Sequence, residues 1–332
     1  MSNTYKVSAA PHARDSITTQ KIMLMVIIAL LPATIVGVLN FGLYSLLVIL
    51  ISVASSILFE YLFEKITKRP ITVSDGSAAL TGLLIGMNMP PTINWWIPIV
   101  GSAVAIIVIK QLYGGLGHNF MNPALGARCF LLISFGTQMT NYATGNGFLG
   151  IVENPVSADL ISGATPLAYL KLGEHFSLKA LFLGNTTGVI GETSAIALLI
   201  GGIFLVAMKI IDYRIPVFYL GTFAVLVFIT SCIRGYSDPF MFTLEELCAG
   251  GIMLGAIFMA TDYVTSPITS KGRIIYAIAL GLLTWIFRMI GKNSEGVSYA
   301  IIFINCLTPM IEHFTVPRAF GVKKAPKKKE EK

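Results

Sequence analysis

The stretch IMLMVIIALLPATIVGVLNFGLYSLLVILISVASSILF, residues 22–59, contains no Asp, Glu, Lys or Arg. A second stretch, residues 76–109, is also free of these four charged residue types. Because about 20 apolar residues cross the hydrocarbon core of a bilayer, each stretch is long enough for more than one crossing. The sequence therefore predicts a polytopic integral membrane protein whose main solvent is the lipid bilayer.

The composition of the 332-residue chain agrees with a membrane location. Hydrophobic residues make up 55% of it and charged residues only 12%, about half the charged fraction of a soluble domain. The net charge is +7, but seven of the 24 Lys and Arg residues lie in the tail, residues 318–332. A short basic tail after a last membrane span is a topology signal, so we expect no nucleic-acid binding.

The apolar runs divide into ten expected crossings, which predicts an all-α polytopic fold. The third and fifth are shorter than a full crossing and are interrupted by Gly and Pro, which indicates short, broken helices. With the N-terminus in the cytoplasm, 19 of the 24 Lys and Arg residues fall on the cytoplasmic side, so both termini are expected there. The expected limits are 22–38, 43–59, 77–89, 96–109, 123–135, 193–208, 215–233, 247–261, 274–289 and 297–311.

An internal similarity at an offset of 173 residues relates the two halves of the chain: residues 82–85 fall on 255–258, and Thr92 falls on Thr265. Because each half holds five spans, the second half must cross with opposite topology, as in inverted-repeat transporters. Chance matching between apolar stretches is the alternative. The expected division is a cytoplasmic N-terminal segment (1–21), a first five-helix repeat (22–135), an outer loop (136–192), a second five-helix repeat (193–312) and a basic cytoplasmic tail (313–332).

The cysteines give no sign of a metal centre. No CxxC or CxxxH pair occurs, so we expect neither a metal nor an iron–sulfur site made by this chain alone. A cluster shared with a partner protein is the alternative. The four residues lie within or beside apolar segments, at Cys129, Cys232, Cys248 and Cys306.

Polar residues at two broken helix ends are candidates for an ion path. Asn88 lies just before two prolines at the end of the third span, and Asp262 and Thr265 follow the eighth. Such breaks free backbone carbonyls that lipid cannot satisfy, so they must be buried in protein or face water. A carboxylate beside carbonyls and hydroxyls suits Na⁺ or a proton. In the alternative interpretation, Asp262 is interfacial and caps the following turn.

The glycine-rich loop GGLGHNFMNPALG, residues 114–126, leads into the fifth span. Pro123 is expected near the first position of that helix, and backbone N–H groups at a helix start suit a phosphate or a flavin carbonyl edge. His118, Asn119 and Asn122 are therefore candidate cofactor-binding residues. A tight re-entrant turn is the alternative, and His118 alone does not indicate a metal ligand.

The longest segment between spans, residues 136–192, contains DLISGATPL at 159–167. A connector of this length indicates a function. Small neighbours are expected to leave the Thr165 hydroxyl open to a large reactant, and Pro166 favours a short helix over 167–172. A phosphoryl ester on Thr165 is plausible if a transferring enzyme supplies base and metal while the hydroxyl attacks a pyrophosphate. From these residues alone, an ordinary turn is the alternative.

The same residues resemble a known recognition sequence. The pattern D-x-x-S-G-A-T is similar to the sequence in which a bacterial flavin transferase esterifies FMN to the final Thr. Together with residues 74–82, 117–124 and 261–267, it resembles, over essentially the whole chain, the family that comprises the RnfD component of the Rnf complex and its homologue in the Na⁺-translocating NADH:quinone oxidoreductase. The long N-terminal extension expected of the quinone-reductase branch is not seen here, which favours the Rnf branch. The matching residues are Asp159, Ser162, Gly163, Ala164 and Thr165.

The resemblance implies covalent FMN on Thr165 at the outer face of the bacterial inner membrane, and a noncovalent riboflavin that no motif places. It implies electron transfer with other membrane and peripheral Rnf subunits, between ferredoxin and NAD⁺, coupled to Na⁺ or H⁺ movement. The chain would then be part of a translocase without holding a complete active site, so no catalytic residue and no metal ligand is expected. Judged by the inverted repeat alone, it would be a solute transporter or channel, and a passive scaffold is a third alternative.

Overall fold

The computed structural model describes residues 17–142, 165–291 and 296–317. Within these ranges every regular element is a helix and no strand occurs. The predicted all-α character is therefore confirmed for the part of the chain that the structure describes.

The first half begins with two long apolar helices, α1 (Thr19–Phe41) and α2 (Leu43–Ile66). Gly42 separates them with a φ of 85°, a backbone conformation that favours glycine. The elements that follow are shorter. They are η1 (Val73–Asp75), α3 (Ser77–Met87), α4 (Ile97–Ala103), the π-helical η2 (Val104–Gln111), α5 (Pro123–Ser134) and α6 (Gly136–Met139).

The second half follows two short helices, α7 (Pro166–Lys171) and α8 (Leu178–Leu183), which belong to the expected outer loop. The predicted helix over 167–172 is thus confirmed, starting one residue earlier, at the proline. The remaining elements are α9 (Ala195–Ala207), α10 (Arg214–Arg234), α11 (Pro239–Cys248), α12 (Ile252–Leu254), the π-helical η4 (Gly255–Met259), α13 (Ser270–Met289) and α14 (Val297–Thr315).

Five of the described helices are long and apolar enough to cross a membrane: α1, α2, α10, α13 and α14. Counting the bent pair formed by α11 and α12–η4 as one span gives six. Four shorter apolar helices, of 10–17 residues each, occupy the third, fourth, fifth and sixth expected spans. Helix length and composition therefore support a polytopic membrane fold, but do not by themselves establish ten full crossings.

The eighth expected span, 247–261, has the wrong start. The helical path begins at Pro239, where the Asp238 side chain accepts a hydrogen bond from the Met241 N–H (3.2 Å). It then bends by 65° between α11 and α12. Gly250, at φ 64°, lies in this bend, and Gly251 approaches the Glu192 carboxylate so closely that an added Cβ would clash with it. The part of the path after the bend, residues 252–259, lies within the expected limits, and the glycines allow the break before it.

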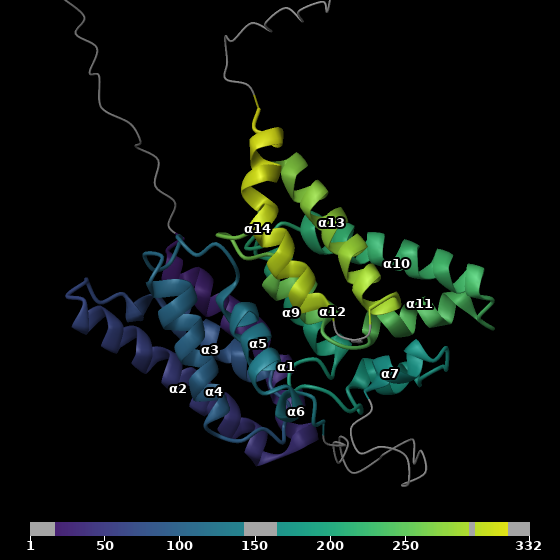
Figure 1. The fold of residues 1–332 in the computed structure, drawn as a ribbon, viewed down its shortest axis with the longest axis horizontal. Coiled ribbons are helices and arrows are strands. Elements are labelled where there is room, and N and C mark those ends of the chain that lie inside the picture. Colours follow the sequence, from purple (N-terminus) through teal and green to yellow (C-terminus); the bar gives the residue numbers. More distant parts are fainter. Residues whose placement is uncertain (1–16, 143–164, 292–295, 318–332) are drawn as a thin grey trace, which may run out of the picture.

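The two halves lie side by side, with α2–α5 in one group and α10, α11, α13 and α14 in the other (Figure 1). They meet where α1 packs on α9 and where α5 packs on α14. Glycine permits the closest approach: a Cβ on Gly201 of α9 would clash with the Ala29 carbonyl oxygen of α1. Small residues at helix contacts are typical of membrane bundles, where dispersion and close packing drive association.

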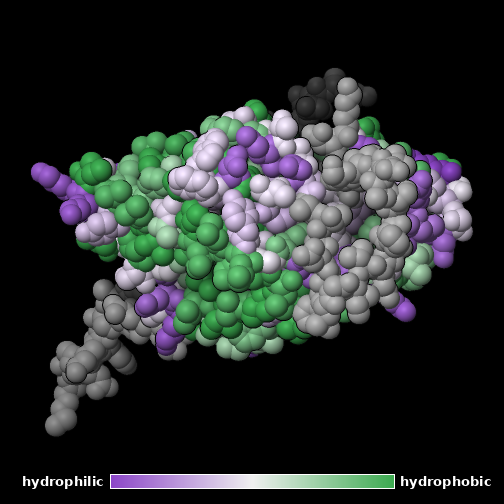
Figure 2. Space-filling model, turned by 90° about the horizontal axis from the view of Figure 1, so that it is seen from below, coloured by the Kyte–Doolittle hydropathy of each residue, from purple (hydrophilic) through white to green (hydrophobic). Residues whose placement is uncertain are grey.

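The outer surface of the long helices is strongly apolar. Large hydrophobic side chains are exposed along α1 and α2, among them Leu24, Leu39 and Leu50. Figure 2 shows extensive hydrophobic surface on one face, with hydrophilic residues gathered in separate patches. In water such a surface would drive aggregation, whereas in a bilayer it contacts lipid chains.

Candidate functional site

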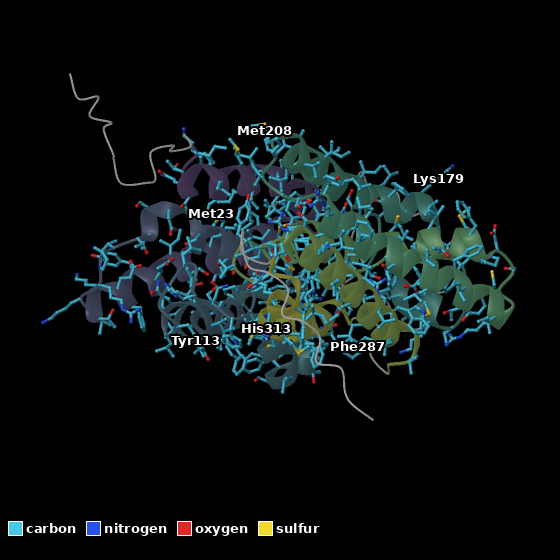
Figure 3. The ribbon with its side chains drawn as sticks, turned by 90° about the horizontal axis from the view of Figure 1, so that it is seen from above. Met23, Tyr113, Lys179, Met208, Phe287 and His313 are labelled. Atoms are coloured by element: carbon cyan, nitrogen blue, oxygen red, sulfur yellow. The ribbon has the colours of Figure 1, made fainter. Side chains whose placement is uncertain are left out.

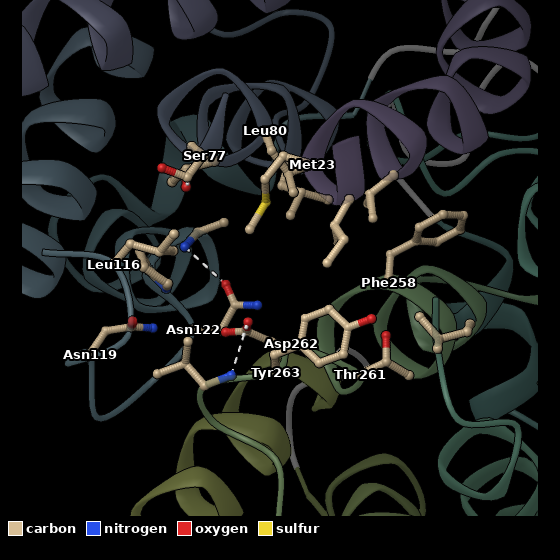
Figure 4. Close-up of a pocket in the computed structure, with 18 of the residues that line it drawn as sticks. Met23, Ser77, Leu80, Leu116, Asn119, Asn122, Phe258, Thr261, Asp262 and Tyr263 are labelled. Atoms are coloured by element: carbon tan, nitrogen blue, oxygen red, sulfur yellow. Dashed lines mark hydrogen bonds between the residues drawn. The ribbon is translucent and has the colours of Figure 1, made fainter. Parts of the chain in front are cut away.

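A central cavity of about 90 Å³ lies between α1, α3, the start of α5 and the segment after η4. Asn119, Asn122 and Asp262 lie on one side of it, opposite Met23 and Leu80 (Figure 4). The cavity wall combines apolar side chains from α1 and α3 with amides, a carboxylate and hydroxyls. This polar–apolar mixture is typical of a site for a small polar ligand or ion.

Asp262 is held by its own turn. Its Oδ1 accepts from the Val264 N–H at 3.4 Å, and its Oδ2 accepts from the Thr265 hydroxyl at 3.3 Å. These are the contacts that the capping interpretation predicts. Burial raises the pKa of Asp262 above its ordinary value of 3.8, although hydrogen bonds from Val264, Thr265 and Asn119 oppose the rise. The carboxyl is thus both a cap and a group that faces the cavity.

Asn122 and Asn119 connect the glycine-rich loop to this turn. Asn122 caps α5, because its Oδ1 accepts from the Ala124 N–H at 3.0 Å, and Pro123 takes the predicted first helical position. Its Nδ2 donates to the Met259 carbonyl at 3.2 Å, which joins α5 to the end of η4. Asn119 lines the same cavity as Asp262 and acts to lower the pKa of that carboxyl. The structure therefore brings together Asn119, Asn122, Asp262 and Thr265.

His118 is not part of this group. Its side chain is exposed and does not line the cavity. The loop that carries it turns tightly at Gly114, Gly115 and Gly117, which have φ values of 121°, 93° and 95°. Only glycine adopts these conformations readily, so the loop has the geometry of a tight turn.

Asn88 belongs to a different buried network. Its Oδ1 accepts from Arg128 Nη1 at 2.7 Å, and the same Nη1 forms a 2.8 Å ion pair with Glu192 Oε1. All three side chains are buried. Asn88 does not line the cavity that Asp262 faces. Asn88 and Asp262 thus belong to different polar clusters, and an ion path that includes both stays a prediction.

A second buried ion pair borders the central cavity. Lys110 Nζ lies 2.7 Å from Glu60 Oε1 and donates to the Ser77 hydroxyl at 2.6 Å. Gln111 Nε2 donates to the same Glu60 oxygen at 2.8 Å. Lys110 and Ser77 line the cavity. The sequence did give a signal for this pair, because Glu60 and Lys110 are the first charged residues after the two long uncharged stretches.

Thr165 occupies the residue before α7 and is only 7% exposed. The expectation of an open hydroxyl is therefore wrong for this conformation. Pro166 and Leu167 are buried where α7 packs on α11, which draws Thr165 into the same contact. Thr165 lines a cavity of about 10 Å³ together with Glu192 and Cys248. The other motif residues, Asp159, Ser162, Gly163 and Ala164, lie outside the described residues.

The volume of this small cavity limits which part of a flavin could lie beside Thr165. A space of about 10 Å³ holds roughly one water molecule, so an isoalloxazine ring does not fit within it. The chemistry of the donor fits better, since Thr165 offers a hydroxyl for a phosphoester. The described residues thus fit the anchor of a covalent FMN and do not form a pocket for its ring.

The elements around Thr165 are tied to the second half of the fold. His175, between α7 and α8, has its Nδ1 3.1 Å from Glu245 Oε2 on α11. Lys171 donates a hydrogen bond to the Gly291 carbonyl after α13. Nearby, Glu246 Oε2 and Arg288 Nη1 form a buried ion pair at 3.0 Å. These contacts fix α7 and α8 against α11 and α13.

No group of three or more His, Cys, Asp or Glu side chains able to hold a metal ion occurs in the part of the chain that the structure describes. All four cysteines are free thiols. Cys129 and Cys248 are buried, and Cys232 and Cys306 are exposed.

Comparison with known proteins assigns the chain to a family. A family model described as NQR2, RnfD, RnfE matches residues 6–321, nearly the whole chain. The chain belongs to the NQR2, RnfD, RnfE family. The family resemblance inferred from residues 159–165 and the three supporting segments is thereby confirmed.

Curated members of the family match over almost their full lengths, and each carries the name of the D component of an oxidoreductase complex. The component of the Na⁺-translocating ferredoxin:NAD⁺ oxidoreductase complex of Acetobacterium woodii is 47% identical, over 97% of this chain and 96% of the relative. That of the proton-translocating ferredoxin:NAD⁺ oxidoreductase complex of Clostridium ljungdahlii is 40% identical, over 97% and 98%. That of the ion-translocating oxidoreductase complex of Cronobacter sakazakii is 36% identical, over 96% and 99%.

Proposed function

We propose that this chain is the membrane flavoprotein subunit of an Rnf-type complex. Such a complex couples electron transfer between ferredoxin and NAD⁺ to the translocation of Na⁺ or H⁺. The observation that carries the proposal is the near-full-length similarity to relatives named as the D component of ferredoxin:NAD⁺ oxidoreductase complexes. The polytopic helical fold and the buried polar groups beside a cavity are consistent with a protein that acts within a bilayer.

The proposed membrane architecture has ten crossings in two inverted five-helix repeats, with both termini in the cytoplasm and residues 136–192 outside. At an offset of 173 residues, α1 corresponds to α9 and α5 to α14. Each of these corresponding helices packs against its counterpart. Two repeats related by a two-fold axis produce such contacts, because a helix near the axis packs against the corresponding helix of the other repeat.

The proposed cofactor is FMN esterified through its phosphate to Thr165, with a second, noncovalent riboflavin as a further prediction. The motif in residues 159–165 supports the ester, as does the hydroxyl at the start of α7. Bound FMN would supply one- and two-electron redox chemistry. Thr165 would hold it, while α7, fixed to α11 and α13, would set the position of the anchor.

The proposed ion path includes the cluster of Asp262, Thr265 and Asn119. These side chains border the central cavity or the turn beside it and present carboxylate, hydroxyl and amide oxygens, which are the ligands that hard cations prefer. The raised pKa of Asp262 also suits proton uptake. Named relatives include both a Na⁺-translocating and a proton-translocating complex, so family membership leaves both ions open.

The proposed partners are the other membrane and peripheral subunits of the complex, and a flavin transferase during maturation. A solute transporter or channel is the second candidate function. The central cavity, with its polar side chains, and the 65° helix break favour it, because transporters commonly bind solutes where broken helices meet. A transporter would have no need of a modified Thr165.

The test of flavin attachment is expression of the full chain with and without its flavin transferase, followed by a denaturing gel imaged for flavin fluorescence. We expect a fluorescent band that requires the transferase and is abolished by Thr165→Ala. Thr186→Ala is the matched control, because Thr186 lines the same small cavity and is also buried. Fluorescence that survives Thr165→Ala, or that never appears with the transferase, would remove the flavoprotein proposal and leave the transporter as the better explanation.

A further inference from the structure

A groove of about 610 Å³ lies where the loop between α9 and α10 meets the segment before α13. Two interactions hold these segments together. Arg273 Nη1 forms a 2.5 Å ion pair with Asp212 Oδ2, across 61 residues of sequence, and the Tyr263 hydroxyl donates to the Ile210 carbonyl. The charged or aromatic side chains that line the groove are Lys209, Asp212, Tyr213, Arg214, Tyr263 and Arg273.

The groove carries an excess of positive charge. Its lining contains three cations, Lys209, Arg214 and Arg273, against the single carboxylate of Asp212. Asp212 Oδ2 lies 2.5 Å from Arg273 Nη1 but 3.9 Å from Arg214 Nη1, so Arg273 is its main partner. No acidic side chain among the described residues lies within ion-pairing distance of Lys209. The groove is therefore complementary to an anion, and Lys209 and Arg214 are the cations available to it.

The surroundings of the groove are those of a membrane interface. Both of its flanking helices, α10 and α13, are membrane-crossing candidates that begin at the groove, at Arg214 and Ser270. Exposed apolar side chains continue from it along each helix. Tyr213 and Tyr263 are 55% and 51% exposed at its rim. Exposed tyrosines beside cations at the ends of apolar helices are typical of the headgroup region.

The groove is lined only by residues of the second half of the chain, from 206 to 273. Met208, the neighbour of Lys209, is exposed and lies at the outer edge of the structure (Figure 3). By the distribution of Lys and Arg, the loops 209–214 and 262–273 are both on the cytoplasmic side, where anionic lipid headgroups attract basic side chains.

We propose that this groove binds the phosphate headgroup of an anionic phospholipid. Lys209 and Arg214 contact the phosphate, while Arg273 is held by Asp212 and shapes the groove. The acyl chains lie along the exposed apolar flanks of α10 and α13. A bound lipid would bridge the α9–α10 loop and the segment that carries Asp262. The proposal does not depend on the flavin.

The test measures the apparent Kd of dioleoylphosphatidylglycerol for the delipidated full-length chain in neutral detergent, by native mass spectrometry. Each of Lys209→Gln and Arg214→Gln is expected to weaken binding about fivefold, and the double variant roughly thirtyfold. Lys209→Arg keeps the charge and is expected to stay within about twofold of the unchanged chain. Dioleoylphosphatidylcholine and inorganic phosphate are tested separately as the zwitterionic and tail-free probes.

Lys68→Gln is the matched control. Lys68 is an exposed lysine after a helix end, with a φ of 54° against 56° for Lys209, but it does not line this groove. It is expected to leave phosphatidylglycerol binding unchanged. Equal weakening by Lys68→Gln would show that general surface charge attracts the lipid, and would overturn the proposal. Inorganic phosphate that binds as tightly as the lipid would also overturn it, because the groove would then recognise a free anion. Equal melting temperatures without lipid would show that every variant is folded.

Discussion

The surroundings of Asp262 and Thr165, the two predicted functional residues, differ in kind. Asp262 faces a cavity of about 90 Å³, and its carboxylate already accepts hydrogen bonds from Val264 and Thr265. Thr165 lines a space of about 10 Å³ beside the Glu192 carboxylate, and α7 begins at the next residue. The first site has room for an ion without rearrangement. Modification of the second requires the residues around Thr165 to open, because a large reactant cannot reach a residue that is only 7% exposed.

An ion site and a covalent anchor place opposite demands on packing. An ion site works when its ligands are preorganised, since an ion gains most from oxygens already in position. A covalent anchor needs only one hydroxyl, and its surroundings can close around it. Changing one side chain of each region at a time tests this difference.

The largest expected effect lies beside Thr165. Arg128→Leu removes the cation that pairs with Glu192 at 2.8 Å and donates to Asn88 at 2.7 Å. Breaking a buried pair from one side leaves the other charge buried and typically costs about 3–5 kcal/mol of unfolding free energy. We expect a loss of that size in denaturant-induced unfolding in detergent. The exposed Lys65→Leu is the control, and an equal loss there would show that charge removal in general is responsible.

The next effect concerns Asp262. In the assembled complex, Asp262→Asn is expected to lower ion transport by roughly tenfold, since a charge-assisted contact is worth about 1.5 kcal/mol or more. Flavin fluorescence on a denaturing gel should stay normal, because Thr165 is held by different elements. The measurement compares ion uptake into vesicles with the rate of electron transfer. Normal uptake in the variant would restrict Asp262 to its capping contacts.

A smaller effect on the free energy of unfolding is expected at the starts of α5 and α7. Asn122 caps α5 through the Ala124 N–H, so Asn122→Ala is expected to cost about 1 kcal/mol of stability. Thr165 precedes α7 without a side-chain capping hydrogen bond. Thr165→Ala should therefore cost clearly less in the same unfolding assay. A larger loss from Thr165→Ala would mean that its hydroxyl has a structural role that the capping contacts do not reveal.

The smallest effect is a pH dependence of opposite sign at two aspartates. Burial raises the pKa of Asp262 above 3.8, so its contribution to stability is present at low pH and lost as pH rises above 3.8 through the folded-state pKa. Burial alone would also raise the pKa of Asp212, but hydrogen bonds from the Arg214 backbone and the Arg273 side chain lower it below 3.8. Its contribution is present above 3.8 and lost as pH falls through the folded-state pKa.

Melting curves between about pH 3 and pH 7 check this contrast, since the window spans the ordinary aspartate pKa. Asp262→Asn should remove a loss of stability with rising pH, whereas Asp212→Asn should remove a loss with falling pH. If both variants change the profile in the same direction, the two carboxylates do not have the opposed environments that the structure gives them.

Several elements followed directly from local sequence. The uncharged run over 22–59 predicted α1 and α2, and Asn122–Pro123 predicted the start of α5. Pro166 predicted α7. In each case the physical cause is local, because apolar length, a capping side chain or a fixed proline φ acts within a few residues. The bend after α11 was missed although Gly250 and Gly251 mark it, because adjacent glycines permit a break without requiring one.

The contacts of the candidate sites also divide into local ones, which the sequence could predict, and long-range ones, which it could not. Asp262 and Thr265 are three residues apart, and their hydrogen bond lies within the range that a turn dictates. The partnerships of Asn122 with Met259, of Lys110 with Glu60 and of Arg273 with Asp212 span 137, 50 and 61 residues. No local rule chooses among the polar partners available at such separations.

Local sequence was therefore enough to predict an integral membrane protein, the positions of most of its helices and the family that it resembles. Hydropathy, charge distribution and short motifs carry that information, because each acts at its own position along the chain. The packing of the helices determines that Asp262 faces a cavity, that Asn88 pairs with Arg128 and that Thr165 is buried. The reason is that a buried polar group without a partner is unfavourable in free energy. Its partner is therefore a side chain that the packing of the helices brings near it.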